Sequence, residues 1–218
     1  MTRLEQGIQY MQEGKWEEAA KLFTEEIEEN PSNPIGYVNF ANLLDAIGDY
    51  ERSIAFYEKA LELDPKLAAA YYGLGNLLYQ QEKFESARAM FELAMQNGLH
   101  NSDLYFMLGF TYVELGNDRL ALPYLQRAVE LNEGDVEAVF QYGLCLARLG
   151  HVAEARPQFE KAIELDDEHA DAYYNLGIVH AYAEDNGKAL ELFRKAVALQ
   201  PDHYLAGNAI RLLEQNLQ

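Results

Sequence analysis

The sequence repeats with a period of 34 residues over nearly its whole length. The pairs Leu74-Gly75 and Leu108-Gly109, for example, fall on this spacing. A unit of this length is one supersecondary element that cannot bury an apolar face alone, so neighbouring units must stack. The period therefore predicts a linear stack that offers a surface for holding another molecule, and any chemistry has to be argued separately.

The repeats predict one continuous array rather than two domains. The expected boundaries are 1–33, 34–67, 68–101, 102–135, 136–169 and 170–203, with residues 204–218 left as one further helix. Within a repeat, Gly48-Asp49 is typical of one helix ending and the next beginning, and Asp64-Pro65 ends the second helix. We therefore expect two helices per repeat, each of about 12–14 residues, and no strands.

Small and bulky residues recur at fixed places in the repeat. The eighth position carries Gly7, Ala41, Gly75, Gly109, Gly143 and Gly177. The twenty-fourth carries Phe23, Tyr57, Phe91, Leu125, Phe159 and Phe193. Large side chains against small ones let two antiparallel helices approach closely and interlock. This pattern predicts the core of each helix pair.

Two departures from the pattern leave alternatives open. Glu82 and Glu184 stand where other mid-repeat turns have glycine, so those two turns are expected to be less rigid. Pro123 and Pro157 fall inside predicted second helices. Each removes a hydrogen-bond donor and clashes with the preceding turn, so either the helix starts late or bends slightly, or the stack changes its curvature there.

The chain is strongly acidic, with a formal net charge of −19 and a pI near 4.5. Nucleic acids and anionic membranes both attract clustered Lys and Arg, so neither is an expected partner. The single cysteine, Cys145, excludes an intrachain disulfide, and no signal peptide or membrane span is apparent. These features favour a cytoplasmic protein, which we expect to be monomeric.

No residues in the sequence have the spacing of a catalytic, phosphate-binding or metal site. His100, His151, His169 and His203 fall in predicted turns, where we expect them to face solvent. His180 falls at a core position and is expected to be packed and hydrogen-bonded. We therefore expect no enzymatic activity, no cofactor and no bound metal.

The repeated positions resemble the tetratricopeptide repeat (TPR), a helix-pair motif with aromatic residues, Leu-Gly, Ala and Pro at fixed offsets. In repeat 68–101 these positions are Tyr71, Leu74, Gly75, Leu78, Ala87, Phe91 and Ala94. The resemblance covers nearly all of the chain. It implies an all-α, right-handed α-solenoid of six helix pairs plus a C-terminal capping helix.

Both ends depart from this motif. Arg3 and Gln6 occupy core positions of the first repeat, which suits an outermost helix with nothing stacked in front of it. The helix expected at 204–218 would seal the last repeat and present a polar outer face. Its sealing stripe is expected to comprise Leu205, Ala209, Leu212 and Leu213. Its polar stripe is expected to comprise Asn208, Arg211, Gln215 and Gln218.

The resemblance implies that the first helix of each repeat lines a concave groove in which a partner binds. The residues that it places on this wall are Asn39, Asn42, Tyr72, Asn76, Tyr79, Phe106, Met107, Phe110, Phe140, Leu144, Arg148, Tyr174, Asn175, Ile178 and Tyr182. The wall is largely apolar and aromatic, which is typical of a binding surface. The alternative is that some of these side chains pack against the adjacent repeat or simply face water.

The implied function is a scaffold that binds a peptide or a partner protein in this groove. By resemblance, Asn42 and Asn76 would hydrogen-bond the main chain of an extended ligand. Arg148 is the one cation at the groove positions of repeats 34–203, so a clamp for acidic peptide tails is absent. We expect instead a ligand with apolar anchors and basic flanks.

A second hypothesis is a structural or self-association role through the ends or the convex face of the stack. Binding that depends on groove residues would favour the scaffold. Binding that depends on convex residues such as Arg88 and Glu92 would favour the structural role.

Overall fold

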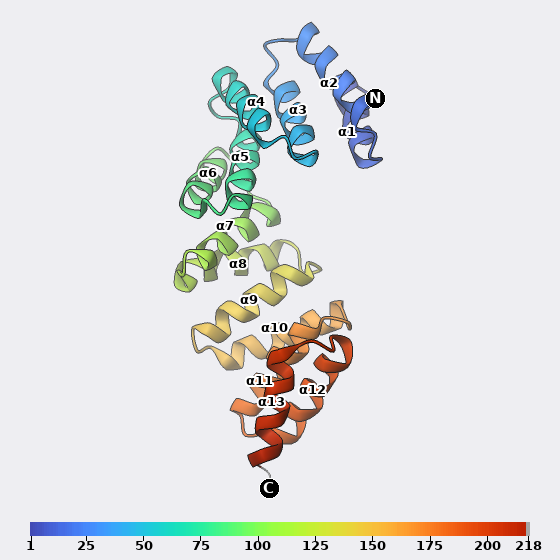
Figure 1. The fold of residues 1–218 in the computed structure, drawn as a ribbon. Coiled ribbons are helices and arrows are strands. Elements are labelled where there is room, and N and C mark those ends of the chain that lie inside the picture. The colour runs from blue at the N-terminus through green and yellow to red at the C-terminus, as the bar shows by residue number, and fades with distance from the viewer. Residues whose placement is uncertain (217–218) are drawn as a thin grey trace. The chain divides into compact units, whose positions relative to one another are not determined.

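The computed structural model describes residues 1–216, and every regular element among them is an α-helix (Figure 1). The helices are α1 (Arg3–Gln12), α2 (Trp16–Glu29), α3 (Pro34–Ala46), α4 (Tyr50–Leu63), α5 (Ala68–Gln80), α6 (Phe84–Gln96), α7 (Ser102–Glu114), α8 (Asp118–Leu131), α9 (Val136–Arg148), α10 (Val152–Leu165), α11 (Ala170–Tyr182), α12 (Asn186–Leu199) and α13 (Tyr204–Asn216). The all-α prediction is confirmed for this part of the chain. Residues 217–218, including Gln218 of the expected polar stripe, lie outside it.

The helices belong to two compact units, residues 1–115 and residues 116–218. The first unit contains α1 to α7 and the second contains α8 to α13; within each, consecutive helices pack together. In the first unit, α1 also contacts α3, α3 contacts α5, and α5 contacts α7. The first helices of successive repeats are therefore neighbours there and share one face. A single continuous array and a right-handed path stay predictions.

The turns inside the helix pairs share one geometry. Gly48 has a φ of 81°, Glu82 has a φ of 59° and Glu184 has a φ of 62°. After Gly48, the Asp49 N–H donates to the Leu44 carbonyl, and after Glu82 the Lys83 N–H donates to the Leu78 carbonyl. This is the left-handed helix stop that glycine normally provides. The two glutamates form the same turn as the glycines, at the conformational cost of a side chain.

The core of each pair is built from the predicted small and large residues. At Gly177, an added Cβ would lie 2.5 Å from a ring carbon of Phe193. The same Cβ at Gly143 would lie 2.9 Å from the ring of Phe159. Both rings are buried in their helix pairs. A side chain at either glycine would therefore displace the aromatic ring or separate the helices.

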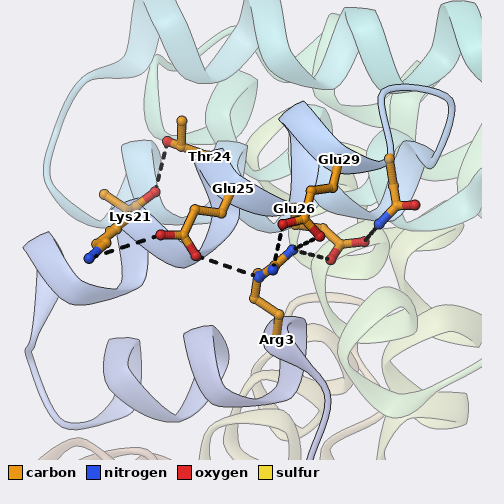
Figure 2. A network of polar contacts seen from close by, with 8 residues as sticks. Arg3, Lys21, Thr24, Glu25, Glu26 and Glu29 are labelled. Atoms are coloured by element: carbon orange, nitrogen blue, oxygen red, sulfur yellow. Dashed lines mark hydrogen bonds and ion pairs between the residues drawn. The ribbon is translucent and has the colours of Figure 1, made fainter.

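The first helix pair is joined by an ion-pair cluster (Figure 2). Arg3 donates two hydrogen bonds of 2.8 Å to the Glu29 carboxylate, and it also lies 3.6 Å from Glu25 and 3.7 Å from Glu26. Figure 2 shows the Arg3 side chain reaching from α1 toward these three residues of α2. The ion pairs with α2 thus account for an arginine at this core position of the motif. An outermost helix with nothing stacked in front of it is not needed as the explanation.

The sealing face of α13 differs from the predicted stripe. Ala206, Ala209, Ile210 and Leu213 pack with Phe193 and the other core residues of α12. Leu205 and Leu212, predicted to seal, are 60% and 58% exposed. The prediction was therefore right for Ala209 and Leu213 and wrong for Leu205 and Leu212, because the sequence offers apolar residues on two faces of this helix and only one face meets α12.

Neither proline delays its helix. Pro123 lies inside α8 and Pro157 lies inside α10, each as the sixth residue. The alternative of a late start is therefore wrong, and a bend or a change in curvature stays a prediction.

Candidate binding surface

An aromatic cluster lies on the first-helix face of the first unit. The ring centroids of Phe106 and Phe110 are 5.5 Å apart, and those of Tyr79 and Phe110 are 5.8 Å apart; both pairs are stacked. Tyr79 comes from α5 and the two phenylalanines from α7, and all three side chains are partly exposed. We call these three residues the aromatic ladder. The structure thus brings three of the predicted groove residues together.

The ladder is edged by negative charge. Burial and the nearby Glu114 carboxylate raise the pKa of Tyr79 to about 12, so its hydroxyl remains protonated at neutral pH. A protonated phenol can donate to Glu114 and leaves the ladder apolar apart from that one polar edge.

Met107, predicted for the same wall, is only partly exposed, and its carbonyl accepts a 2.6 Å hydrogen bond from Thr111.

A cavity of about 250 Å³ lies between α3, α5 and the segment that leads into α7. We call it the α3–α5 cavity. Its polar lining includes the predicted residues Asn42, Tyr72 and Asn76, together with Asp45 and Asn101. Its apolar lining is Val38, Ala69 and Leu99, and Tyr57 and Gly73 also line it. None of the lining residues is Lys or Arg.

The polar side chains that line this cavity differ in whether they have a hydrogen-bond partner. Asn42 Oδ1 accepts a hydrogen bond from the Tyr57 hydroxyl. Burial raises the pKa of Tyr57, as does the nearby Asp45 carboxylate, and burial also raises the pKa of Asp45 itself. Asn76 Oδ1 is buried and accepts no hydrogen bond from a described residue. Asn42 and Asn76 are therefore not equivalent, although they stand at the same repeat position.

In the second unit, an apolar pocket of about 270 Å³ is formed by α9, α10 and α11. Three predicted groove residues line it: Asn175, Ile178 and Tyr182. Ile178 is 42% exposed and Tyr182 is 79% exposed. The Asn175 side chain donates a 2.8 Å hydrogen bond to the Asp171 carbonyl, so its polar end is held by its own helix. This pocket presents mainly hydrocarbon to solvent.

Several predicted wall residues serve the core instead. Asn39 and Phe140 are buried, with 8% and 6% of their surfaces exposed. The Phe140 ring packs 6.0 Å from Phe159 and 4.5 Å from the His169 ring. For Asn39 and Phe140 the alternative of a packed side chain therefore holds, and neither residue lies on an open wall.

Of the other predicted residues in the second unit, Leu144 and Tyr174 are partly buried and Arg148 is exposed. Leu144 is a partly buried neighbour of the core around Phe159. Tyr174 packs its ring 5.7 Å from Phe193 and 5.0 Å from His203, and it keeps some exposure. Arg148 lies 3.6 Å from Asp118, so its charge is already partly neutralised.

Two histidines have structural roles that the sequence analysis missed. His169 and His203 are the residues before α11 and α13, and their Nδ1 atoms accept backbone hydrogen bonds of 3.3 and 3.2 Å. His203 is buried, and its Nε2 lies 3.1 Å from Asp171. The expectation of a solvent-facing His203 was wrong. The sequence did contain a signal: His203 lies 34 residues after His169, so both histidines occupy the same repeat position and could be expected to cap the helix that follows.

The remaining histidines follow expectation. His180 is packed, with Nδ1 3.2 Å from the Asp185 carboxylate, and His100 and His151 are exposed. Within residues 1–216, no three or more His, Cys, Asp or Glu side chains are grouped as they would be to hold a metal ion. No helix in the described part of the chain has the length and hydropathy of a membrane span.

Comparison with family models agrees with the repeat pattern. One model, described as TPR repeat, matches residues 41–82. Three others, described as tetratricopeptide repeat, match residues 5–35, 106–158 and 135–202.

A known protein and its crystal structure are similar to this chain. The TPR repeat-containing protein YrrB of Bacillus subtilis (strain 168) is 54% identical over 41 residues, which are 19% of this chain and 20% of that relative. The matched segment thus spans about a fifth of the curated relative. The crystal structure of YrrB, a TPR protein with an unusual peptide-binding site, aligns at 53% identity with a TM-score of 0.82. That alignment covers 88% of this chain and 99% of the other.

More distant structures share the architecture. Pseudomonas aeruginosa pilF aligns with a TM-score of 0.83 at 20% identity and covers 94% of each chain. MamA aligns with a TM-score of 0.71 at 22% identity, over 78% of this chain and 93% of the other. At these identities the likeness concerns the fold alone.

Proposed function

Because this chain belongs to the tetratricopeptide repeat family, we propose that it is a non-enzymatic scaffold that holds a peptide or partner protein against the first-helix face of its repeats. The observation that carries the proposal is the aromatic ladder of Tyr79, Phe106 and Phe110. Three stacked, partly exposed rings from two neighbouring helices are what an interface anchor requires. The peptide-binding site attributed to YrrB supports the same use of the fold.

The chemistry of the ligand follows from apolar surface and acidic charge. The ladder and the pocket at Ile178 and Tyr182 favour apolar anchor residues, while the net charge of −19 and the Glu114 carboxylate favour basic flanks. Such a ligand is an extended peptide or an amphipathic helix. Acidic peptides that end in a free carboxylate find no cationic clamp on this face and should not bind.

The test is selection of a random peptide library on the intact protein, followed by binding of the enriched pool to variants. Phe106→Ala with Phe110→Ala should weaken binding by about tenfold or more, since aromatic anchors at interface centres carry about 2 kcal/mol or more. The matched control is Tyr50→Ala with Leu63→Ala, which removes exposed apolar surface from α4, where the side chains are 44% and 37% exposed.

The control should bind the pool as well as the wild-type protein. Retained binding by the ladder variant, together with loss in the α4 variant, would contradict the proposal. Arg88 and Glu92 are unsuitable as the convex control because Arg88 lies 3.6 Å from Glu92 and Glu92 accepts a 2.8 Å hydrogen bond from the buried Tyr112. Changing them would disturb packing as well as surface charge.

One observation favours the second candidate, self-association through an end. Tyr204, Leu205 and Leu212 of α13 are 81%, 60% and 58% exposed. If this row joins two copies of the chain, the protein should dimerise in sedimentation experiments, and Leu205→Ser with Leu212→Ser should return it to monomer. A wild-type protein that sediments as a monomer at all concentrations tested would remove this candidate.

A further inference from the structure

The α3–α5 cavity contains a buried acceptor without a donor. Asn76 Oδ1 is inaccessible to solvent and receives no hydrogen bond from a described residue. Burial raises the pKa of the neighbouring Tyr72, and the Asn76 side chain acts on that pKa in the opposite direction. The amide oxygen is thus left to accept from something else. Native proteins rarely leave a buried acceptor in this condition unless the position has a further use.

The other residues that line the cavity add negative charge and include no Lys or Arg. Asp45 is partly buried and forms no ion pair with a described residue, while Asp103 places a second negative charge near Tyr72. The Asn42 oxygen is occupied by the Tyr57 hydroxyl, and the Asn101 oxygen is occupied by the Leu104 N–H. Among the carboxylate and amide oxygens of the lining, those of Asp45 and Asn76 accept no hydrogen bond from a described residue.

We propose that the α3–α5 cavity is a subsite for one cationic side chain, Lys or Arg, of a bound peptide, with the Asp45 carboxylate accepting from its head group and the Asn76 side chain turning so that Oδ1 accepts from it as well. The inference rests on the proposed function, and it assigns the basic flank of the ligand to a particular place. A volume of about 250 Å³ is below the range of roughly 300–1,000 Å³ typical of small-molecule sites and suits a single side chain. Val38, Ala69 and Leu99 line the cavity with apolar surface that can cover the methylene stem.

The test is an NMR titration of the intact protein with N-acetyl-lysinamide and N-acetyl-argininamide. Both should give saturable shifts at the side-chain amide of Asn76 and at the backbone amides of Asp45 and Tyr72. The neutral probes N-acetyl-norleucinamide and N-acetyl-citrullinamide should bind about tenfold more weakly or not at all, since a charge-assisted hydrogen bond is lost. Equal shifts with charged and neutral probes would overturn the inference.

Two matched variants separate a built subsite from general attraction to an acidic surface. Asp45→Asn keeps the shape of the side chain and should weaken the cationic probes about tenfold. Glu114→Gln also removes one carboxylate from the first-helix face of the same unit, and it should leave the affinity within about twofold. Equal weakening by both variants would show a diffuse electrostatic effect and would overturn the subsite.

The outcomes for the two proposals are distinguishable. If the cationic probes leave the α3–α5 cavity unperturbed while the enriched peptide pool still binds through Phe106 and Phe110, the subsite is wrong and the scaffold stands. If the probes fill the cavity but no peptide pool binds, the cation site stands and the scaffold is wrong.

Discussion

At the residue scale, the molecule depends on a few close contacts between glycine and aromatic rings. Gly177 and Gly207 are both glycines inside helices, but their surroundings differ. A Cβ at Gly177 would meet the Phe193 ring at 2.5 Å, whereas a Cβ at Gly207 would meet no atom within 4 Å. A glycine is therefore required at the position of Gly177 but not at the position of Gly207.

We predict opposite effects for the same substitution at these positions. Gly177→Ala should lower the free energy of unfolding by about 1–2 kcal/mol, because overpacking outweighs the gain in helix propensity. Gly207→Ala should raise it by up to about 1 kcal/mol through helix propensity alone. Denaturant unfolding measures both values, and a shift of the same sign in the two variants would contradict the assigned packing.

Individual side chains also explain why parts of the candidate site were not predicted. The 34-residue period predicts the positions of the ladder residues because they follow the motif. It does not predict that Tyr57 engages Asn42, because that depends on one hydroxyl at a position where most repeats have phenylalanine. The burial of His203 was missed for a similar reason: sequence assigns it to a turn, but the Asp171 carboxylate and the α13 backbone hold it inside.

At the element scale, the helix pairs follow one plan, so their differences are informative. The turn at Glu82 has the left-handed geometry of the glycine turn at Gly48, with the same pattern of backbone hydrogen bonds. The backbone geometry depends on these hydrogen bonds and on the packed helices that flank the turn, and the lower rigidity expected at Glu82 stays a prediction. The absence of glycine is a local strain that the pair tolerates.

This strain gives a stabilising substitution. Glu82→Gly should raise the free energy of unfolding by about 0.5–1 kcal/mol, because the left-handed conformation suits glycine and the exposed Glu82 side chain is dispensable. Gly48→Ala, the matched reverse change, should lower it by about 1 kcal/mol. Thermal unfolding compares the two, and a destabilised Glu82→Gly variant would show that the side chain has an unrecognised role.

The docking of α1 on α2 gives a pH-dependent effect. The hydrogen bond from Arg3, and to a lesser extent its charge, lower the pKa of Glu29 from its ordinary value. A carboxyl group whose folded pKa is depressed stabilises the fold above its unfolded pKa, and the contribution is lost as pH falls through the folded pKa. Glu29→Gln should therefore lower the melting temperature at pH 7, and the difference from wild type should close below about pH 4.

The control for this effect is Glu28→Gln, the exposed neighbour on the same helix. It removes the same charge from the acidic chain but leaves Arg3 and its partners intact. Its melting temperature should follow that of the wild type at both pH values. Equal behaviour of the two variants would mean that the general charge, and not the Arg3 pair, controls the pH dependence.

At the scale of the whole molecule, function follows from how surface chemistry is distributed over repeated elements. The first unit combines the aromatic ladder with the acidic α3–α5 cavity, and the second unit has an apolar pocket at Ile178 and Tyr182. A net charge of −19 should speed association with a basic ligand and make that rate fall as salt increases. Affinity, in contrast, should depend mainly on the apolar anchors.

The most direct test of the central claim is a residue-resolved map of amide NMR shifts when an enriched peptide binds. The account predicts that the largest shifts fall on α3, α5 and α7 of the first unit, around Tyr72, Asn76, Phe106 and Phe110. Shifts confined to the second helices, such as α4 and α6, or to α13 would contradict it and would show that the partner uses another face.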